Sequence, residues 1–579
     1  MSPSQPQPQP QPPPNSLIIV GAGMAGIKVA HTCFKYDPSM SITLLDANDY
    51  VGGRIRNEQF QHHTVELGAN WISGGITTNT NPLFVADNSD DSGDNGVGGV
   101  NPIWKLAQEI QLQGHESDRD DHVHVIDCTS ANGDDDNTSN KDITNEYLNV
   151  CQRFNECYET AVKLCRERQI QHDNDVDVKT FLQEYCGWIA TTPIEHAVEY
   201  NVLEVWVCDT LQKLSVAHDL QPNANDVELG QDEYFVEDGR GFNSILNGMV
   251  EDILQEKNKN NKTKNQCKIL LQHQVQTIDY TTPGHCKVTA LDIASGTTKE
   301  FSADAIVCTV SLGVLKSNKI AFVPPLPKWK VTAFNEMDMF TFSKVFVEFD
   351  TTTTTTNGDG EDGVPPCWWP QNQHQVVLVS DTKGHYPLWM KYRGTNYNNK
   401  KNDNDDKRSS IFMCYVGGSE AQRVEHLSEE QLKDEIQELF YKAFGSTTTT
   451  NANDNNNNND SKNSSSITMF RPTHVKVTDW SRNPNFCGSY SYHPVHSFAK
   501  IPFDDLTRGV SSPSSPTTTF TAGSDAADDT TTTSPSSSSP TSLYFAGECY
   551  DDKFNGWVQG AYLSGERVAK SIMLGSSTQ

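Results

Sequence analysis

The sequence predicts an α/β protein with more than one domain, and three observations carry this prediction. The 579 residues exceed the usual size of a single domain. Residues 17–20 form a short apolar run that ends at a glycine, which is typical of a buried parallel strand. Residues 42–46 form a second such run, and residues 24–36 between them are compatible with a helix. Strand, helix and strand in this order predict a βαβ unit near the N-terminus.

The glycines after the first run predict that this unit binds a dinucleotide. Gly21, Gly23 and Gly26 match the pattern G-x-G-x-x-G, with Ala25 in the last variable position. Such glycines allow a tight turn and a close approach of the backbone, and the following helix presents its positive end to a pyrophosphate. Asp46 lies 20 residues after Gly26, where a carboxylate can accept hydrogen bonds from ribose hydroxyls. The alternative is a glycine-rich turn without a ligand, and the ordered strand, helix and acid argue against it.

Apolar spacing and capping predict two further helices. Apolar side chains recur at steps of three and four through residues 147–165, which indicates one buried helical face. Ser428 and Gln431 form the start of a capping box, and Gly445 follows as a stop signal. Runs rich in β-branched and aromatic residues predict strands at residues 305–310, 344–349, 376–379 and 411–416.

Polar low-complexity tracts interrupt these elements. They are too polar to bury apolar surface, so we expect them to be loop expansions on an ordinary core. They lie near residues 88–99, 129–140, 258–265, 351–363, 396–410, 446–466 and 509–541. Residues 1–14 are rich in Pro and Gln and are predicted to be a disordered tail.

Composition excludes several classes of partner and compartment. Lys and Arg number 45 and Asp and Glu 75, for a net charge of −30, which argues against nucleic acid and anionic membranes as partners. A cationic partner and simple solubility both fit this charge. The 14 cysteines include no C-x-x-C pair, so no metal site or dithiol motif is predicted. A reduced cytoplasmic chain is expected, with a peroxisome or another organelle as the alternative. No apolar run approaches 18 residues, so no membrane span is predicted.

The residues after the second strand distinguish between two dinucleotides. Gly52, Gly53 and Arg54 follow this strand closely, an arrangement shared by many flavoproteins but not ordinarily by NAD dehydrogenases. Arg54 is expected to supply a fixed cation to the pyrophosphate. An ordinary surface arginine is the alternative. FAD is therefore the predicted cofactor.

From here the chain resembles the flavin-containing amine oxidases, most closely their polyamine oxidase branch. Matching blocks occur in the family's order at residues 21–26, 45–54, 65–71, 101–104, 239–242, 310–316, 324–330, 342–346, 488–492, 545–548 and 556–565. The resemblance implies a Rossmann-type FAD-binding domain built from discontinuous segments, at residues 15–75, 236–318 and 481–579. It also implies an α+β substrate-binding domain at residues 76–235 and 319–480.

The resemblance also assigns residues to the cofactor. Glu548 is expected to bond a ribityl hydroxyl, and Trp557 and Val558 to lie near the isoalloxazine at a helix N-terminus. Val275 corresponds to the position whose backbone holds the adenine. Asn70 and Trp71 belong to a block that reaches the flavin edge. Ser489 stands where monoamine oxidases carry their attachment cysteine, so the FAD is predicted to be non-covalent.

The resemblance places the chemistry on one lysine and two aromatic residues. In similar enzymes the lysine at Lys344 holds a water against flavin N5, a role that a lowered pKa suits. A solvated strand lysine is the alternative. Tyr490 and Trp557 correspond to aromatics that flank the amine, where ring faces stabilise a cation by roughly 0.5–2 kcal/mol. Core packing is the alternative for both.

Departures from the family pattern bear on the substrate. Ser73 stands where several polyamine oxidases have an acid, and Asp209 is the remaining candidate for a second family acid. The sequence predicts oxidation of an amine, with a polyamine as the leading substrate, by hydride transfer to FAD and reoxidation by O2 to give H2O2. The alternatives are a monoamine, an amino acid or methylated lysine as substrate, or a non-catalytic FAD-binding scaffold. The oligomeric state is left open.

Overall fold

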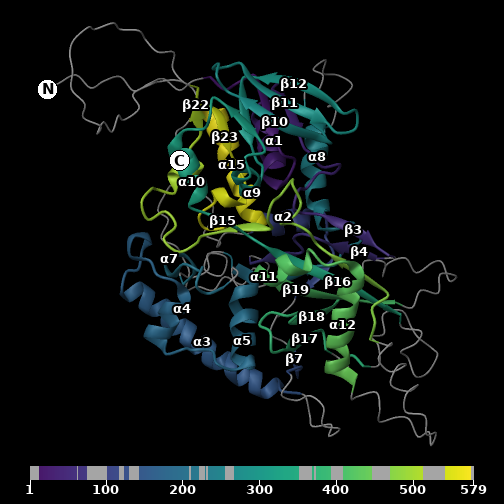
Figure 1. Cartoon of the computed structure of the whole chain (residues 1–579). Coiled ribbons are helices and arrows are strands. Elements are labelled where there is room, and N and C mark those ends of the chain that lie inside the picture. The colour runs from purple at the N-terminus through teal and green to yellow at the C-terminus, as the bar shows by residue number, and fades with distance from the viewer. Residues whose placement is uncertain are drawn as a thin grey trace, which may run out of the picture.

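The computed structural model describes most of the chain and gathers its elements into two groups. The described residues are 12–61, 63–74, 101–116, 123–129, 142–207, 210–220, 229, 233–254, 267–350, 368–370, 373–392, 409–445, 470–512 and 541–575. In Figure 1 the upper group contains α1, α8, α15 and β10–β12, and the lower group contains α3–α5, α12 and β16–β19. Among the described helices, none combines the length and apolar character that crossing a membrane requires. Most of the predicted tail and most of the predicted inserts lie outside the described residues.

A six-stranded sheet forms the centre of the upper group. Its order is β22-β23-β13-β1-β2-β9, and β1 pairs in parallel with both β2 and β13. The bounds are β1 Ser16–Val20, β2 Ser41–Leu45, β9 Cys267–Leu270, β13 Ala305–Cys308, β22 Val510–Ser511 and β23 Thr541–Phe545. The strands predicted at residues 17–20, 42–46 and 305–310 are therefore confirmed. Strands from both ends of the chain and from its middle meet in one sheet.

The first and last long helices of the chain pack against each other beside this sheet. Figure 1 shows α15 (Val558–Leu574) alongside α1 (Met24–Tyr36), which confirms the predicted helix. Their contact is close because a Cβ atom on Gly565 would lie 2.6 Å from the carbonyl oxygen of Ala25. Lys28 on α1 also pairs with Glu566 on α15 at 2.8 Å. The N- and C-terminal parts of the chain thus form one structural unit.

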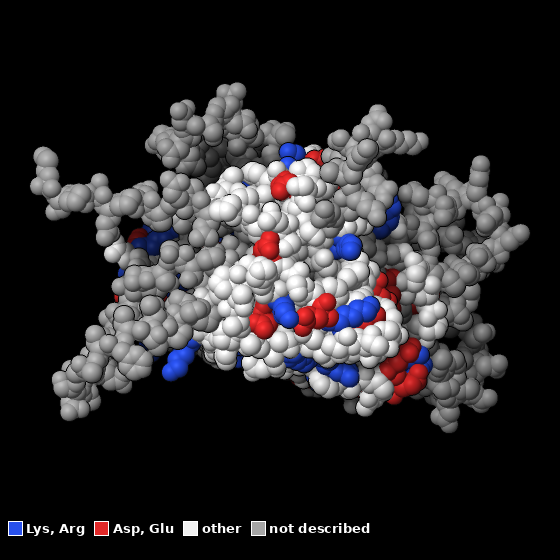
Figure 2. Space-filling model, turned by 90° about the horizontal axis from the view of Figure 1, so that it is seen from above, with Lys and Arg blue, Asp and Glu red and all other residues white. Residues whose placement is uncertain are grey.

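A second, largely antiparallel sheet forms the top of the upper group. Its order is β12-β11-β10-β14, with bounds β10 His273–Asp279, β11 Cys286–Asp292, β12 Thr297–Ala303 and β14 Ala321–Val323. Seen from above in Figure 2, basic and acidic side chains stand next to each other on the described part of this face. Lys287 with Glu300, at 3.0 Å, and Lys299 with Asp292, at 2.6 Å, are pairs of this kind. This sheet presents mixed charge to solvent.

The lower group is built on a mixed six-stranded sheet with helices packed around it. The sheet order is β20-β16-β19-β18-β17-β7. Its bounds are β7 Val123–Asp127, β16 Phe342–Asp350, β17 Gln375–Val379, β18 Leu388–Tyr392, β19 Ser409–Gly417 and β20 His474–Val477. The strands predicted at residues 344–349, 376–379 and 411–416 are confirmed.

Seven helices of the lower group lie in the described residues, and two of them were predicted from the sequence. They are α3 Thr144–Glu167, α4 Val178–Phe181, α5 Pro193–Glu199, α6 Val205–Val207, α7 Val216–Asp219, α11 Gly418–Val424 and α12 Glu429–Phe444. On α3 the predicted apolar face is buried at Tyr147, Phe154 and Cys165. On α12, Ser428 and Gln431 form the predicted capping box, and the helix ends before Gly445.

The remaining elements of the described residues are short. The small sheets are β3 Asn57–Phe60 with β4 His63–Glu66, β5 Trp71–Ser73 with β8 Glu233–Val236 and β6 Gly114–Glu116, and β15 Asp338–Phe340 with β21 Tyr490–Tyr492. The remaining helices are α2 Pro102–Glu109, α8 Asn247–Leu254, α9 Leu312–Lys316, α10 Lys328–Asn335 and α14 Asp504–Thr507. Single-turn and π-helical segments are η2 His172–Asn174, η3 Leu182–Cys186, η4 Tyr200–Glu204, η6 Phe242–Leu246 and η10 Glu548–Tyr550.

Candidate active site

One cavity of about 1170 Å³ extends from the glycine loop to residues of the lower group. Its lining includes nearly every residue that the sequence analysis singled out: Gly21, Gly23, Ala25, Asp46, Gly53, Arg54, Asn70, Trp71, Ser73, Val275, Lys344, Tyr490, Glu548, Trp557 and Val558. Gly26 is not among the lining residues. Asp209 lies outside the described residues. Segments hundreds of residues apart in the sequence therefore converge on one space.

The dinucleotide end of the cavity is shaped by glycine. Gly21 has φ +109°, in the region that favours glycine, and a Cβ there would lie 2.5 Å from Thr309 Oγ1. A Cβ on Gly26 would lie 2.0 Å from the carbonyl oxygen of Gly21, so Gly26 permits close packing of α1 on the loop. A Cβ on Gly53 would lie 3.4 Å from the Cα of Gly23. The bare backbone at Gly23 and Gly53 leaves a cradle that fits a pyrophosphate.

Asp46 lies at the end of β2, beside this cradle. One of its carboxylate oxygens accepts a hydrogen bond from the Ala22 amide at 2.7 Å, and the other accepts one from the Asn48 amide at 2.8 Å. Burial raises the pKa of Asp46, and these hydrogen bonds oppose the shift. The carboxylate is thus fixed at the strand end where a ribose acceptor is required.

Arg54 and Glu548 join the two ends of the chain at the cavity wall. Arg54 Nη1 donates to Glu548 Oε1 at 2.9 Å and to the carbonyl oxygen of Ser489 at 2.9 Å. Glu548 Oε2 accepts from Ser491 Oγ at 2.5 Å and from the Gly556 amide at 2.9 Å. Both carboxylate oxygens are therefore bonded within the protein. Glu548 fixes the loop that leads to Trp557.

Lys344 is buried on β16 and bonded to the segment that precedes β5. Its Nζ donates to the carbonyl oxygens of Glu66 at 3.0 Å and Gly68 at 2.6 Å, and to Asn70 Oδ1 at 2.8 Å. Burial lowers the pKa of Lys344, and the Glu66 carboxylate opposes this shift. Burial also raises the pKa of Glu66, whose Oε1 accepts from the Phe242 amide at 2.7 Å. The lysine is placed where a proton can be gained or lost inside the protein.

Aromatic side chains wall the other end of the cavity. The Tyr490 hydroxyl donates to the carbonyl oxygen of Trp206 at 2.5 Å, which fixes the tilt of its ring. Phe342 lies 6.1 Å from Tyr490 and 5.4 Å from Tyr415, measured between ring centroids. Trp71 Nε1 donates to the Tyr415 hydroxyl at 3.0 Å. Together with Trp557 these rings form the aromatic wall, defined as Trp71, Trp206, Phe342, Tyr415, Tyr490 and Trp557.

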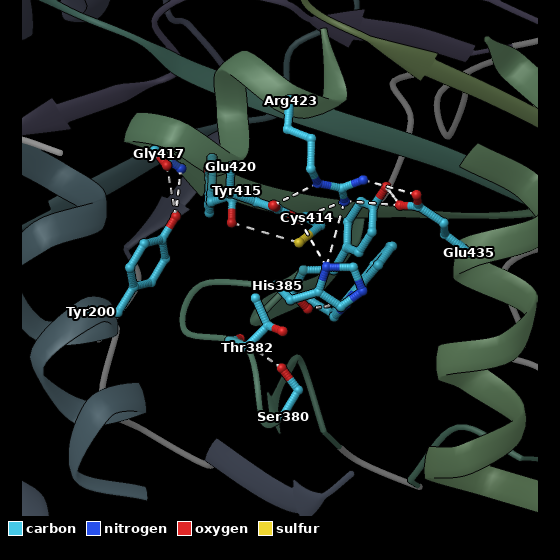
Figure 3. A network of polar contacts seen from close by, with 12 residues as sticks. Tyr200, Ser380, Thr382, His385, Cys414, Tyr415, Gly417, Glu420, Arg423 and Glu435 are labelled. Carbon is cyan, nitrogen blue, oxygen red and sulfur yellow. Dashed lines mark hydrogen bonds and ion pairs between the residues drawn. The ribbon is translucent and has the colours of Figure 1, made fainter. Parts of the chain in front are cut away.

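Two polar contacts hold the strand that carries Tyr415. The amide of Gly417 donates to the Tyr200 hydroxyl at 2.7 Å, and that hydroxyl donates to the Gly417 carbonyl oxygen at 3.0 Å. Directly after β19, Arg423 donates to the carboxylates of Glu420 and Glu435 through bonds of 2.8 Å (Figure 3). These bidentate contacts fix α11 against α12. The end of β19, and with it Tyr415, is held from both sides.

The match of the sequence to a family profile now decides the family. The profile described as flavin containing amine oxidoreductase matches residues 24–573. The chain belongs to this family. Its curated relatives include polyamine oxidase 1 of Zea mays, 25% identical over 562 residues that cover 96% of this chain and 90% of the relative. Polyamine oxidase 6 of Oryza sativa subsp. japonica is 22% identical over 564 residues, with coverage of 96% and 90%.

Solved structures of the family share the fold. Wild-type putrescine oxidase bound to putrescine superposes with a TM-score of 0.59 at 15% identity, covering 96% of this chain and 99% of that one. Cyclohexylamine oxidase from Brevibacterium oxydans superposes with a TM-score of 0.58 at 14% identity, covering 97% and 99%. The predicted family, amine oxidase fold, flavin cofactor and enzyme class are therefore confirmed.

Ser489 has a structural place at the predicted attachment position. Its Oγ accepts from the Phe342 amide and donates to the Phe342 carbonyl oxygen, both at 2.8 Å. Cys487, two residues earlier, contacts the Pro484 carbonyl oxygen through its Sγ. In the part of the chain that the structure describes, no cysteine lines the cavity.

The structure adds an acid that the sequence analysis did not assign. Ser73 on β5 pairs directly with Glu233 on β8, and Ser73 Oγ lies 3.4 Å from Glu233 Oε1. Both residues line the cavity. The residue that replaces the family acid thus has a carboxylate on the neighbouring strand. Trp206 and Tyr415 were also not assigned to the site.

Proposed function

We propose that this family member is a polyamine oxidase with non-covalent FAD. The single observation that supports the proposal is the continuous cavity, in which a backbone cradle, a buried lysine and the aromatic wall share one space. A flavin in this cradle would accept a hydride from the carbon beside the amine nitrogen, and O2 would reoxidise it with release of H2O2. The products would be an aldehyde and a shorter amine.

The aromatic wall would orient the amine. The faces of Tyr490 and Trp557 attract a cation and leave a neutral amine unhindered, so the nitrogen can enter charged and react after losing its proton. The hydrogen bond from Tyr490 to the Trp206 carbonyl oxygen holds the ring in place before the substrate arrives. The wall therefore supplies positioning, which is the main demand of a hydride transfer.

Glu233 would bind a second, distal ammonium of the substrate. A polyamine carries several positive charges, and the family acid is absent at Ser73. The Glu233 carboxylate lies on the paired strand within 3.4 Å of Ser73 Oγ and faces the same cavity. A hydrogen bond to a charged group contributes about 1.5–3 kcal/mol, enough to separate a diamine from a monoamine. We propose that this carboxylate replaces the missing one.

The test of the activity is an amine panel with two readouts. Purified protein is mixed anaerobically with spermine, spermidine, their acetyl forms, putrescine, a monoamine and a methylated lysine peptide, and flavin absorbance is followed. Peroxide release is then measured in air. We expect bleaching and peroxide with one or more polyamines. Bleaching by the monoamine or the peptide alone would reassign the substrate, and a yellow protein that no amine bleaches would support a scaffold.

Replacement of Glu233 tests the substrate assignment. Glu233→Gln keeps the size of the side chain and removes its charge, so we expect KM for a polyamine to rise by about tenfold or more. The rate with a monoamine should stay the same because it has no distal charge. Glu116→Gln on the adjacent strand β6 is the matched control, since Glu116 is exposed and outside the cavity lining. Equal effects of the two substitutions on KM would remove Glu233 from the site.

The domain boundaries and the compartment also remain proposals. The upper group of elements supports an FAD-binding domain assembled from residues 15–75, 236–318 and 481–579, although β14 of the following segment pairs with β10. The twelve cysteines of the described residues are free thiols, the form kept in the cytoplasm.

A further inference from the structure

Two histidines and an aspartate come together in the cavity wall from three separate parts of the chain. His218 lies on α7, His493 directly follows β21, and Asp552 lies between η10 and α15. Their ligand-capable nitrogen and oxygen atoms all lie within 4.8 Å of one another. All three residues line the cavity. The separation in sequence explains why spacing motifs did not reveal this cluster.

The chemistry of the cluster matches a divalent transition metal. Two imidazoles and one carboxylate form a ligand set used for Zn²⁺ and for other borderline divalent ions. The Nε2 atoms of both histidines are buried. His493 Nδ1 lies 3.2 Å from Ser497 Oγ, and in the tautomer whose Nδ1–H donates to this hydroxyl oxygen the lone pair is on Nε2. Metal-binding histidines are commonly oriented by such a partner on the other ring nitrogen.

The three side chains would have to rearrange to bind a metal ion. The imidazoles of His218 and His493 are stacked, with centroids 3.6 Å apart and planes inclined by 16°. Ligand atoms of a tetrahedral zinc site lie about 3.3 Å apart, so binding would shorten the separations in the cluster by at most about 1.5 Å. One ring must also turn out of the stack, and this torsion is soft for imidazole. His493 is buried, His218 is half-buried and Asp552 is exposed, so Asp552 can approach without disturbing the core.

We propose that His218, His493 and Asp552 form a Zn²⁺-type metal site in the wall of the amine cavity. Three protein ligands leave a fourth position, which faces the cavity because all three side chains line it. A bound divalent ion adds positive charge to this wall. It therefore opposes entry of a cationic amine and inhibits its oxidation.

The test is calorimetric titration of Zn²⁺ into flavin-loaded protein after treatment with a chelator. We expect a tightest site of one ion per chain, which His218→Gln and Asp552→Asn each weaken by at least about tenfold. His426→Gln is the matched control because His426 is exposed and outside the cavity lining. Flavin absorbance of each variant checks its fold, and the exposed Asp552 provides a second variant should His218→Gln lose flavin. Tightest-site binding that is unchanged in both variants overturns the proposal.

Cu²⁺ provides a structural readout independent of activity. Electron paramagnetic resonance of one equivalent of Cu²⁺ on the holoenzyme should show hyperfine coupling to two imidazole nitrogens, reduced to one in His218→Gln. Coupling that is the same in His218→Gln as in wild type overturns the site. Inhibition of amine turnover by Zn²⁺ rests on the proposed function, whereas calorimetry and resonance do not. Failure of the metal site is therefore distinguishable from failure of the polyamine assignment.

Discussion

Lys344 has as many acceptors as its ammonium has protons. Its Nζ contacts two carbonyl oxygens and Asn70 Oδ1, and these are the three bonds that an ammonium can donate. To hold a water towards the flavin, it must release one contact or lose a proton. Burial lowers its pKa, which favours the second route. We therefore expect the lysine both to fix the segment before Trp71 and to take part in proton transfer.

Replacement of Lys344 separates these roles through the pH profile. Lys344→Met should lower the rate of anaerobic flavin reduction by about 10²–10⁴-fold, the usual contribution of a positioned acid or base. In wild type the neutral lysine accumulates as pH rises through its lowered pKa, so the rate should rise along this limb. The variant should lack the limb, as measured by stopped-flow absorbance across pH. Lys476→Met on β20, outside the cavity lining, should keep it. A limb at the lowered pKa of the lysine that survives in Lys344→Met contradicts the proton role, whereas a limb at the higher pKa of the substrate amine is expected in both proteins.

The sequence predicted individual residues of the site where each lies within a family motif. Lys344, Tyr490 and Trp557 stand in family blocks, and the structure places all three at one cavity. Glu233, Trp206 and Tyr415 could not be predicted because their place depends on strand register and packing. The pairing of Ser73 with Glu233 joins residues 160 positions apart, and no local pattern records it.

At the scale of elements, a buried lysine connects two helices of the upper group. Lys330 on α10 is fully buried, and its Nζ donates to the carbonyl oxygens of Leu506 at 2.5 Å and Arg508 at 2.7 Å, at the end of α14. Its Nζ also lies 4.4 Å from the centroid of the Phe545 ring. Burial lowers the pKa of Lys330 to about 7. The contact closes the end of a short helix that has few bonds of its own.

Lys330→Met should change the pH dependence of stability. The lysine pKa is about 7 in the folded protein and about 10.4 when unfolded, so the unfolded state binds more protons between these values. The free energy of unfolding of the wild type therefore rises as pH rises through this window, because unfolding takes up a proton and protons become scarcer. It falls again as pH falls towards 7. The variant should lack this contribution, of up to about 1.4 kcal/mol per pH unit, in denaturant titrations at pH 8 and 10. Lys328→Met, exposed on the same helix, is the control. If the free energy of unfolding has the same pH slope in Lys330→Met and in wild type, Lys330 does not cause the pH dependence.

Element prediction succeeded where an apolar run or a capping signal marks the element. The apolar run of β1 and the capping box of α12 predicted those elements close to their observed bounds. Strands such as β5 and β21 have three residues each. This is too short for the alternation of apolar and polar residues that identifies a strand in a sequence. These short strands carry Trp71, Ser73 and Tyr490, so the elements that are hardest to predict position much of the site.

At the scale of the whole molecule, the ion pair of Arg54 and Glu548 connects residues 494 positions apart. The pair is asymmetric, because the Glu548 side chain is 6% exposed and the Arg54 side chain 24%. Discontinuous assembly could be predicted from family order alone, since motifs at both ends of the chain belong to one cofactor site. The role of Glu548 in this joining could not be predicted, because the family pattern assigns its carboxylate to a ribityl hydroxyl of the cofactor and says nothing of Arg54.

Glu548→Gln tests whether this residue joins the chain ends or serves the cofactor. Loss of its charge leaves the Arg54 guanidinium partly buried without a counterion, which costs about 3–5 kcal/mol when a buried pair is broken. If Glu548 joins the chain ends, the variant should unfold at lower temperature whether or not flavin is bound, because the pair needs no ligand. Melting is followed by circular dichroism in flavin-free and flavin-loaded protein, with Glu300→Gln on β12 as a control, since Glu300 pairs with Lys287 of the neighbouring strand, away from the chain ends and the cavity lining. A loss of stability confined to the flavin-loaded form would instead make Glu548 a ligand of the cofactor. The two ends of the chain would then be held together by the packing of α1 on α15 and by the six-stranded sheet that contains β1 and β23.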